Sequence, residues 1–213
     1  MEESKYLKLA RQAREENNSE DAKKYYDMVR TDEPENVEAK FFYAYYSLYE
    51  GKNGEIPTRF VNLCKSVLSS VKMIAGSDTE KTEKIQLMKT VLNTFVPETW
   101  SMNRYMNHKN HETKVGDQYV QVFSSKDITS CGKTGMDTLK QLGDSLAVSF
   151  GEGDADGLML AAIAWKEFVA LSQKWYAWAV KGEAEAYAEK IKAAEPDYEM
   201  PKKAGCISLA DKK

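Results

Sequence analysis

Residues 127–134 of this 213-residue chain, Asp-Ile-Thr-Ser-Cys-Gly-Lys-Thr, differ at one position from the phosphate-binding pattern GxxxxGK[ST]. That chemistry needs glycine first, so that the backbone can turn and direct its amides at a phosphate. Asp127 occupies this position instead, and its carboxylate would repel the anion. We therefore predict a turn or part of a helix here, with Lys133 at the surface.

The chain's two histidines, His108 and His111, are spaced so that a helix would place both imidazoles one turn apart, as metal ligands can be. The spacing identifies no third ligand nearby apart from Glu112 and the distant Cys131. We predict no metal site and no cofactor.

Asp154 and Asp156 precede Gly157 in a pattern that matches part of a calcium-binding loop. The bidentate acid that such a loop requires falls on Ile163, which has no ligand atom. We predict a loop before a helix, with Asp156 as the N-cap. Because no nucleophile–base arrangement can be proposed from spacing either, we expect a protein that is not an enzyme.

The composition is that of a folded globular protein, with 42% hydrophobic and 30% charged residues and a net charge of −3. This charge gives no general electrostatic reason to expect binding to nucleic acid or to an anionic membrane. The cysteines are odd in number and widely spaced, which favours a reducing compartment. They are Cys64, Cys131 and Cys206.

Charged side chains interrupt the longest apolar stretch, 158–180, and argue against a membrane span. They are Lys166, Glu167 and Lys174. The N-terminus also lacks the apolar segment of a secretion signal. We expect a cytoplasmic location.

Helical periodicity runs through nearly the whole chain. Helices are predicted at about 4–16, 19–31, 37–50, 57–71, 77–95, 136–150, 156–180 and 184–194. Asn18 or Ser19 can cap the second helix and Asn36 the third. Pro97 either begins a new helix or kinks a continuous one. For 119–123 we prefer helix, because we see no second strand for it to pair with.

Aromatic residues are dense on the last long helix, where four fall on one arc and are predicted to lie in the core. They are Trp165, Phe168, Trp175 and Tyr176. Trp178 points toward the polar edge of the same helix and is expected to be exposed.

Small and large residues alternate over the first two helices as in a helical hairpin. Tyr6, Leu9 and Ala10 share one face, and Ala22, Tyr26 and Val29 share another. Asn17-Asn18 makes the turn and Pro34 ends the unit. This pattern resembles the tetratricopeptide repeat, and a second unit matches it in Ala39, Ala44 and Gly51. The resemblance covers roughly residues 3–75. The remainder resembles the helical region that follows such repeats in some uncharacterised bacterial proteins.

The resemblance implies an all-α fold with three parts. Residues 1–75 would form tetratricopeptide-like hairpins stacked as a short solenoid, and 76–200 a helical region docked on them. Residues 201–213 would form a flexible tail. One and a half repeats do not bury a core alone, so the later helices must cover the open end of the stack.

The resemblance further implies a non-enzymatic module that binds a protein or peptide in a groove formed by the first helix of each repeat. In this chain the groove would be lined by Leu7, Arg11, Arg14, Phe41, Tyr45 and Tyr49. Aromatic rings offer contact area at little entropic cost, and arginines offer forked donors for a carboxylate. Packing of the tyrosines against the following helix is equally compatible with the pattern.

Two other functions stay open at this point. The first is a small-molecule or nucleotide-binding protein with a pocket in the C-terminal half, which would need Lys133 or the histidines to converge on a cavity. The second is a structural piece that self-associates within a larger assembly.

Overall fold

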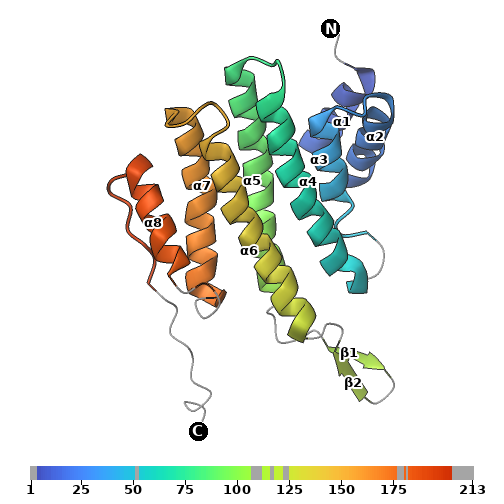
Figure 1. Ribbon diagram of the computed structural model, residues 1–213. Coiled ribbons are helices and arrows are strands. Elements are labelled where there is room, and N and C mark those ends of the chain that lie inside the picture. Colours follow the sequence, from blue (N-terminus) through green and yellow to red (C-terminus); the bar gives the residue numbers. More distant parts are fainter. Residues whose placement is uncertain are drawn as a thin grey trace.

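The computed structural model describes residues 4–50, 53–106, 112–115, 118–121, 125–176, 180 and 182–202. These residues form an all-α architecture with one short strand hairpin (Figure 1). The helices are α1 (Lys5–Glu15), α2 (Ser19–Asp32), α3 (Val37–Tyr46), α4 (Ile56–Gly76), α5 (Lys81–Met106), α6 (Ser125–Ala147), α7 (Ala155–Leu171) and α8 (Glu183–Ala194). A 3-10 turn (Asn53–Glu55) precedes α4, and a π-helical turn (Ser172–Tyr176) follows α7.

Asparagine side chains begin the second and third helices, as the sequence predicts. The Asn18 side chain accepts a hydrogen bond from the Asp21 amide at 3.2 Å, and Asn36 accepts one from the Ala39 amide at 3.0 Å. Asn17 adopts a left-handed conformation, with φ of 57°, and this reverses the chain between α1 and α2.

The N-terminal helices pack in chain order, α1 on α2, α2 on α3 and α3 on α4. Ala10 and Ala22 are fully buried where the first two helices meet, which lets the backbones approach closely. Tyr26 fills the space beyond them and stacks on Phe42 of α3, with ring centroids 5.1 Å apart.

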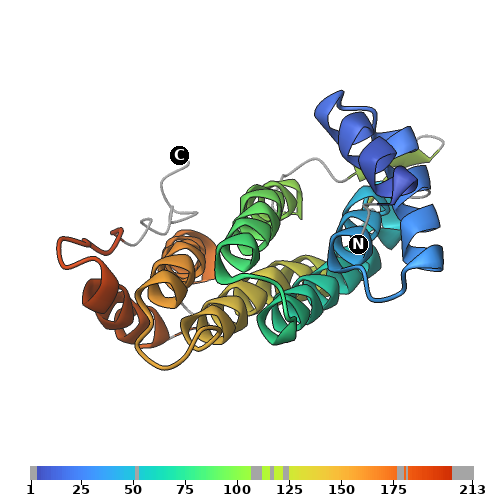
Figure 2. The same ribbon diagram turned by 90° about the horizontal axis from the view of Figure 1, so that it is seen from above.

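The order changes after α4. Helix α6 lies between α4 and α7, and α8 packs on the far side of α7. Helix α5 covers one face of this curved layer and contacts α4, α6 and α7 (Figure 2). Buried apolar side chains from α1 through α8 form one continuous core cluster.

Glycines allow α6 to occupy its central position. A Cβ on Gly132 would lie 1.7 Å from the Tyr176 hydroxyl and 2.6 Å from Oδ1 of Asn103. A Cβ on Gly135 would lie 2.9 Å from the Phe60 ring. The Gly132-Lys133 pair therefore lies within a helix, where the glycine serves close packing and Lys133 is exposed.

The segment that we expected to be helical near 119–123 is in part a strand. Strand β2 (Gln118–Gln121) pairs antiparallel with β1 (Glu112–Val115), and Thr113 lies opposite Val120. The expectation was wrong because Glu112–Val115 begins with three consecutive polar residues and therefore gives no apolar alternation that would identify a strand.

Several helix ends also differ from the sequence-based expectation. Helix α3 ends at Tyr46, short of Glu50. Ser77 does not open α5, because its hydroxyl donates back to the Ile74 carbonyl at the end of α4. Asp154, and not Asp156, caps α7 by accepting from two backbone amides at 3.1 Å. Pro97 lies inside a continuous α5.

No helix among the described residues is both long enough and apolar enough to span a membrane. On the last long helix, Trp165 and Phe168 are buried as predicted, and so is Tyr176 in the following turn. Trp175 is partly buried, and Trp178 lies outside the described residues.

Candidate functional site

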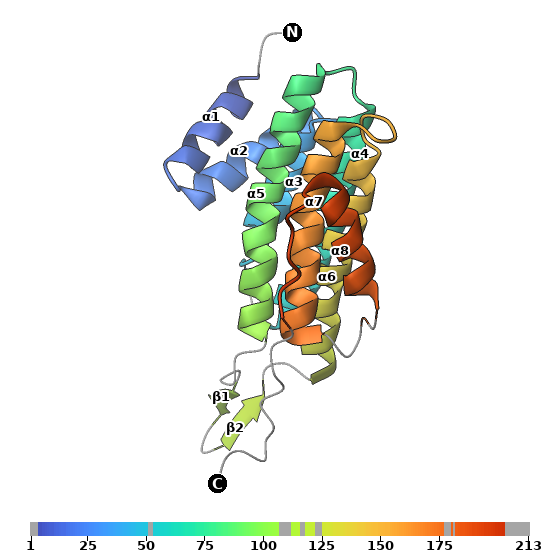
Figure 3. The same cartoon turned by 90° about the vertical axis from the view of Figure 1, so that its left-hand side faces the viewer.

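A groove of about 280 Å³ opens between α1, the start of α3, the end of α4 and the start of α5. Figure 3 shows the same region from the side, with α1 and α2 standing apart from the upper part of α5. The groove has an apolar part made by side chains from four helices. They are Leu7 of α1, Val37 of α3, Ile74 of α4 and Leu87 of α5.

Polar side chains make up the rest of the groove lining. Three carboxylates, of Glu35, Glu38 and Glu83, line it together with the guanidinium of Arg11. Asn36 at the start of α3, with Ser77 and Thr79 of the α4–α5 connection, completes the polar lining.

A small apolar recess adjoins the groove and shares Val37, Ile74 and Leu87 with it. Its volume is about 10 Å³, and its inner wall includes the rings of Phe41 and Phe42. A space of this size and lining is suited to the end of an aliphatic side chain and offers little to a water molecule.

Glu38 holds the wall of the groove together. Its carboxylate accepts two hydrogen bonds from Nε of Arg11, at 3.1 and 3.0 Å, and one from Nη2 at 2.5 Å. Arg14 Nη1 donates to the same carboxylate at 3.1 Å, and the Tyr26 hydroxyl donates to it at 2.9 Å. These contacts tie α1 and α2 to α3 through one carboxylate.

Electrostatics favour the charged form of this carboxylate. Burial alone would raise the pKa of Glu38, but the hydrogen bonds and charge of Arg11, the Tyr26 hydroxyl and the charge of Arg14 outweigh it, so that the pKa is lowered. Burial, reinforced by the charge of Glu38, raises the pKa of Tyr26, which stays a neutral donor.

Two predicted groove residues lie away from the groove, Tyr45 near the end of α3 and Tyr49 in the turn that follows it. Tyr45 is half-buried and stacks beside Phe41, with centroids 6.5 Å apart. Tyr49 is exposed at the ring, yet its hydroxyl donates to the Glu98 carboxylate of α5. This hydrogen bond links the turn after α3 to α5.

The six predicted groove residues therefore divide into three groups. Leu7 and Arg11 line the groove, and Arg14 lies behind its wall on Glu38. Tyr45 lies near the end of α3, and Tyr49 lies in the turn after it. Phe41 is fully buried and is not available to a partner, because its ring packs on Phe42 in the core.

The two arginines also differ from the expectation. We expected their forks to meet a carboxylate of a partner, but in this structure they bind Glu38. Their guanidinium groups therefore hold Glu38 in the groove wall.

Sequence reasoning predicted only Leu7 and Arg11 of the eleven residues that line the groove. Val37 stands four residues before Phe41 on the same helix face, and this spacing could have identified it. Glu38 carried no signal beyond an acid in the first turn of a helix. Glu83 and Leu87 belong to α5, whose position over the layer no local pattern indicates.

The other candidate motifs show no converging site in the described part of the chain. His108 and His111 lie outside the described residues. Among the residues that are described, no group of three His, Cys, Asp or Glu side chains could hold a metal ion. Burial raises the pKa of the Cys64 thiol to about 12, which makes it a poor nucleophile at neutral pH.

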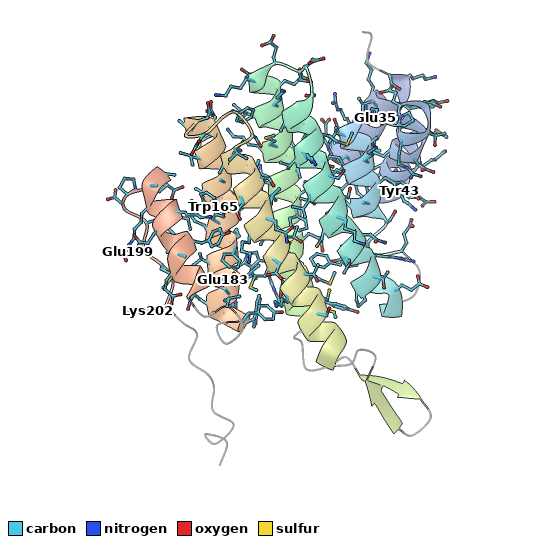
Figure 4. All side chains as sticks on the ribbon, viewed as in Figure 1. Glu35, Tyr43, Trp165, Glu183, Glu199 and Lys202 are labelled. Carbon is cyan, nitrogen blue, oxygen red and sulfur yellow. The ribbon has the colours of Figure 1, made fainter. Side chains whose placement is uncertain are left out.

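The C-terminal helices are joined by polar contacts of a structural kind. Trp165 and Glu183, both labelled in Figure 4, lie where α6, α7 and α8 meet. Asp144 of α6 accepts there from Trp165 Nε1 at 3.3 Å, the Tyr187 hydroxyl at 2.6 Å and Lys190 Nζ at 3.0 Å. Toward α5, Trp100 Nε1 donates to Glu167 at 2.6 Å.

Comparison with known protein families, with curated proteins and with solved structures finds no significant match to this chain. The site is therefore interpreted from its own geometry and chemistry.

Proposed function

We propose that this protein is a non-enzymatic interaction module that binds a segment of another protein in the groove between α1, α3 and α5. One observation carries the proposal. Helices that are distant in the sequence bring an apolar surface and a charged wall together in an open groove of about 280 Å³. A partly apolar groove with a few polar groups is the usual form of a peptide-binding site.

The rigidity of the groove wall supports this function. Glu38 is 8% exposed and is bound by two arginines and a tyrosine, so the wall needs no rearrangement to present its surface. A site that is ordered in advance loses less entropy on binding. We further propose that α1 to α4 are tetratricopeptide-like hairpins. The consecutive packing of these helices and the buried Ala10, Ala22 and Tyr26 support this assignment.

The alternative of a nucleotide site in the C-terminal half has no comparable support. Lys133 is exposed in the interior of α6, where the backbone amides are not arranged to receive a phosphate.

Affinity capture from a lysate of the source cells tests the proposal. The bait would be the wild type or a variant with a blocked groove, Leu87→Arg. A second blocked variant, Thr79→Trp, changes the rim of the groove and covers the case in which Leu87→Arg does not fold. Met159→Arg is the matched control, because Met159 is an exposed apolar residue of α7, away from the groove. Circular dichroism establishes that each variant is folded.

A captured protein that binds the wild type and Met159→Arg, but neither blocked variant, would support the groove as the binding site. Its affinity for each purified variant would then be measured by calorimetry. Identical captured sets for all four proteins would contradict the proposal.

A further inference from the structure

The strand hairpin projects from the helical body. Strands β1 and β2 lie beyond the ends of α5 and α6 (Figures 1 and 3). In the described part of the chain, neither strand packs extensively on a helix. A two-stranded hairpin without such support is marginally stable at best in water, and further strands or a covering helix are needed to stabilise it. The hairpin would therefore gain stability from pairing with another strand.

The two strands differ in what they offer to such a partner. The described sheet contains only β1 and β2, so each strand has one edge without a strand partner. Strand β2 has no charged residue, and nothing in its sequence selects one partner over another. Strand β1 has charges of both signs, at Glu112 and Lys114. Charges on an edge strand normally discourage pairing with other strands.

These charges make β1 complementary to itself. In an antiparallel pair about a two-fold axis, the axis must pass through a residue position, because residues that lie opposite each other share one face of the sheet. With the axis at Thr113, this residue lies opposite its own copy, and Glu112 lies opposite Lys114 of the second copy, twice. Cross-strand Thr–Thr pairs and pairs of opposite charge both stabilise a sheet. An axis at Glu112 or at Lys114 would instead place like charges opposite each other, which is destabilising.

We infer that β1 is a self-association surface, which pairs antiparallel with β1 of a second copy in the register that centres on Thr113. The result is a four-stranded sheet in the order β2-β1-β1-β2. The charges that discourage other strands thus select a second copy of the same chain. Because the axis is perpendicular to the sheet and each helical body lies at one end of its hairpin (Figure 1), the two bodies come to opposite ends of the joined sheet. This surface is separate from the groove, and the inference does not depend on the proposed function.

Sedimentation equilibrium of the purified full chain over a series of concentrations tests the inference. The test variants are Glu112→Lys and Lys114→Glu, each of which places like charges opposite each other in the dimer. Glu152→Lys and Lys65→Glu are the matched controls, because they make the same changes in net charge at exposed positions of the α6–α7 connection and of α4. Circular dichroism establishes that the helical body of each variant is folded.

We expect the wild type to dimerise reversibly. The dissociation constant of the dimer should rise by about tenfold in each hairpin variant, because two attractive cross-strand pairs become repulsive. An equimolar mixture of Glu112→Lys and Lys114→Glu should restore dimerisation, since every charged pair in the mixed dimer again has opposite signs. The double variant should dimerise as the wild type does. The two controls should behave as the wild type, both alone and mixed.

Three results would overturn the inference. The first is a wild type that stays monomeric up to about 1 mM. The second is a dimer that the hairpin variants leave unchanged, or that their mixture does not restore. The third is a dimer that Thr79→Trp abolishes and the hairpin variants do not, which would place the second copy in the groove. A monomeric wild type leaves the proposed function standing, because the capture experiment tests the groove separately.

Discussion

Tyr49, which is 55% exposed, donates a hydrogen bond to the Glu98 carboxylate, which is 8% exposed in α5. Burial raises the pKa of Glu98, and the hydrogen bond from Tyr49 partly opposes this. The Tyr49 hydroxyl thus stabilises the charged form of a carboxylate that is largely buried. The hydrogen bond also joins the turn after α3 to α5, the helix that borders the proposed binding groove.

Replacement of Tyr49 by Phe should lower the free energy of unfolding by about 1 kcal/mol at neutral pH, because buried Glu98 loses a donor. A carboxyl whose folded-state pKa is raised costs stability as pH rises from its ordinary pKa through the folded value. Loss of the donor raises that value further, so the deficit of Tyr49→Phe should grow with pH. Urea unfolding at about pH 4 and about pH 8 measures it. Tyr6→Phe, at an exposed tyrosine, is the control. A deficit independent of pH would contradict the assignment.

Glu38→Gln should destabilise the protein by about 2 kcal/mol at neutral pH, since it leaves Arg11 and Arg14 without their counter-charge. Arg11 is 39% exposed, so solvent limits the loss. The folded-state pKa of Glu38 is lowered, so its contribution is full above the ordinary carboxyl range and disappears as pH falls through the folded value. Denaturant titrations across this range should show the two proteins converging at acid pH. Glu83→Gln, at an exposed residue of the same groove, should stay within about 0.5 kcal/mol of wild type.

Gly132→Ala should destabilise the protein by about 3 kcal/mol, because the new Cβ would collide with the hydroxyl of Tyr176. That hydroxyl donates to Asn103 Oδ1 at 2.8 Å in the interior. In Tyr176→Phe the hydroxyl is gone, so the loss in the double variant should be smaller than the sum of the single losses. Gly76→Ala, where nothing lies within 4 Å of the added Cβ, is the control and should be neutral or stabilising. Thermal and urea unfolding of all four variants measure these effects, and strict additivity would refute the proposed collision.

Asp144→Ala should loosen α8 selectively. The helix has 12 residues, a length that is marginal without tertiary contacts, and Tyr187 and Lys190 attach it to Asp144. Hydrogen exchange should become about tenfold faster over Glu183–Ala194, which corresponds to about 1.4 kcal/mol of local opening, and stay unchanged in α1–α3. Glu189→Ala removes an ion pair within α8 and should have little effect. Equal acceleration throughout the chain would argue against a local attachment.

Local sequence signals predicted the helices well where the residues that give the signal also make the contact in the structure. Asn18 and Asn36 are caps whose hydrogen-bond partner lies three residues away, so spacing alone identifies them. The alanines between α1 and α2 were predicted equally well, because a close contact of helices requires small side chains.

Two signals that are compatible with more than one local structure were misread. Ser77 has the spacing of a capping box, but its hydroxyl closes α4 because the chain turns there before α5 begins. Residues 112–115 and 118–121 are short and largely polar, and only their mutual pairing distinguishes them from a helix.

Only part of the candidate site could be predicted from the sequence. The resemblance to the tetratricopeptide repeat indicated Leu7 and Arg11, whereas the opposite wall comes from α5, more than 70 residues later in the chain. Phe41, which the resemblance placed in the groove, is instead buried, because the sequence does not show how many helices cover a given face.

The packing order of the helices changes at α4, and the parts of the molecule on either side of it differ in how cooperatively they unfold. In α1 to α4 each helix packs mainly on its neighbour in the chain, so most contacts there are local. From α4 onward, α5, α6 and α7 enclose one another through contacts between non-consecutive helices, and none can leave without exposing the others. The groove lies where these two parts of the molecule meet. A segment bound there would couple the N-terminal helices to the more cooperative part that α5, α6 and α7 form.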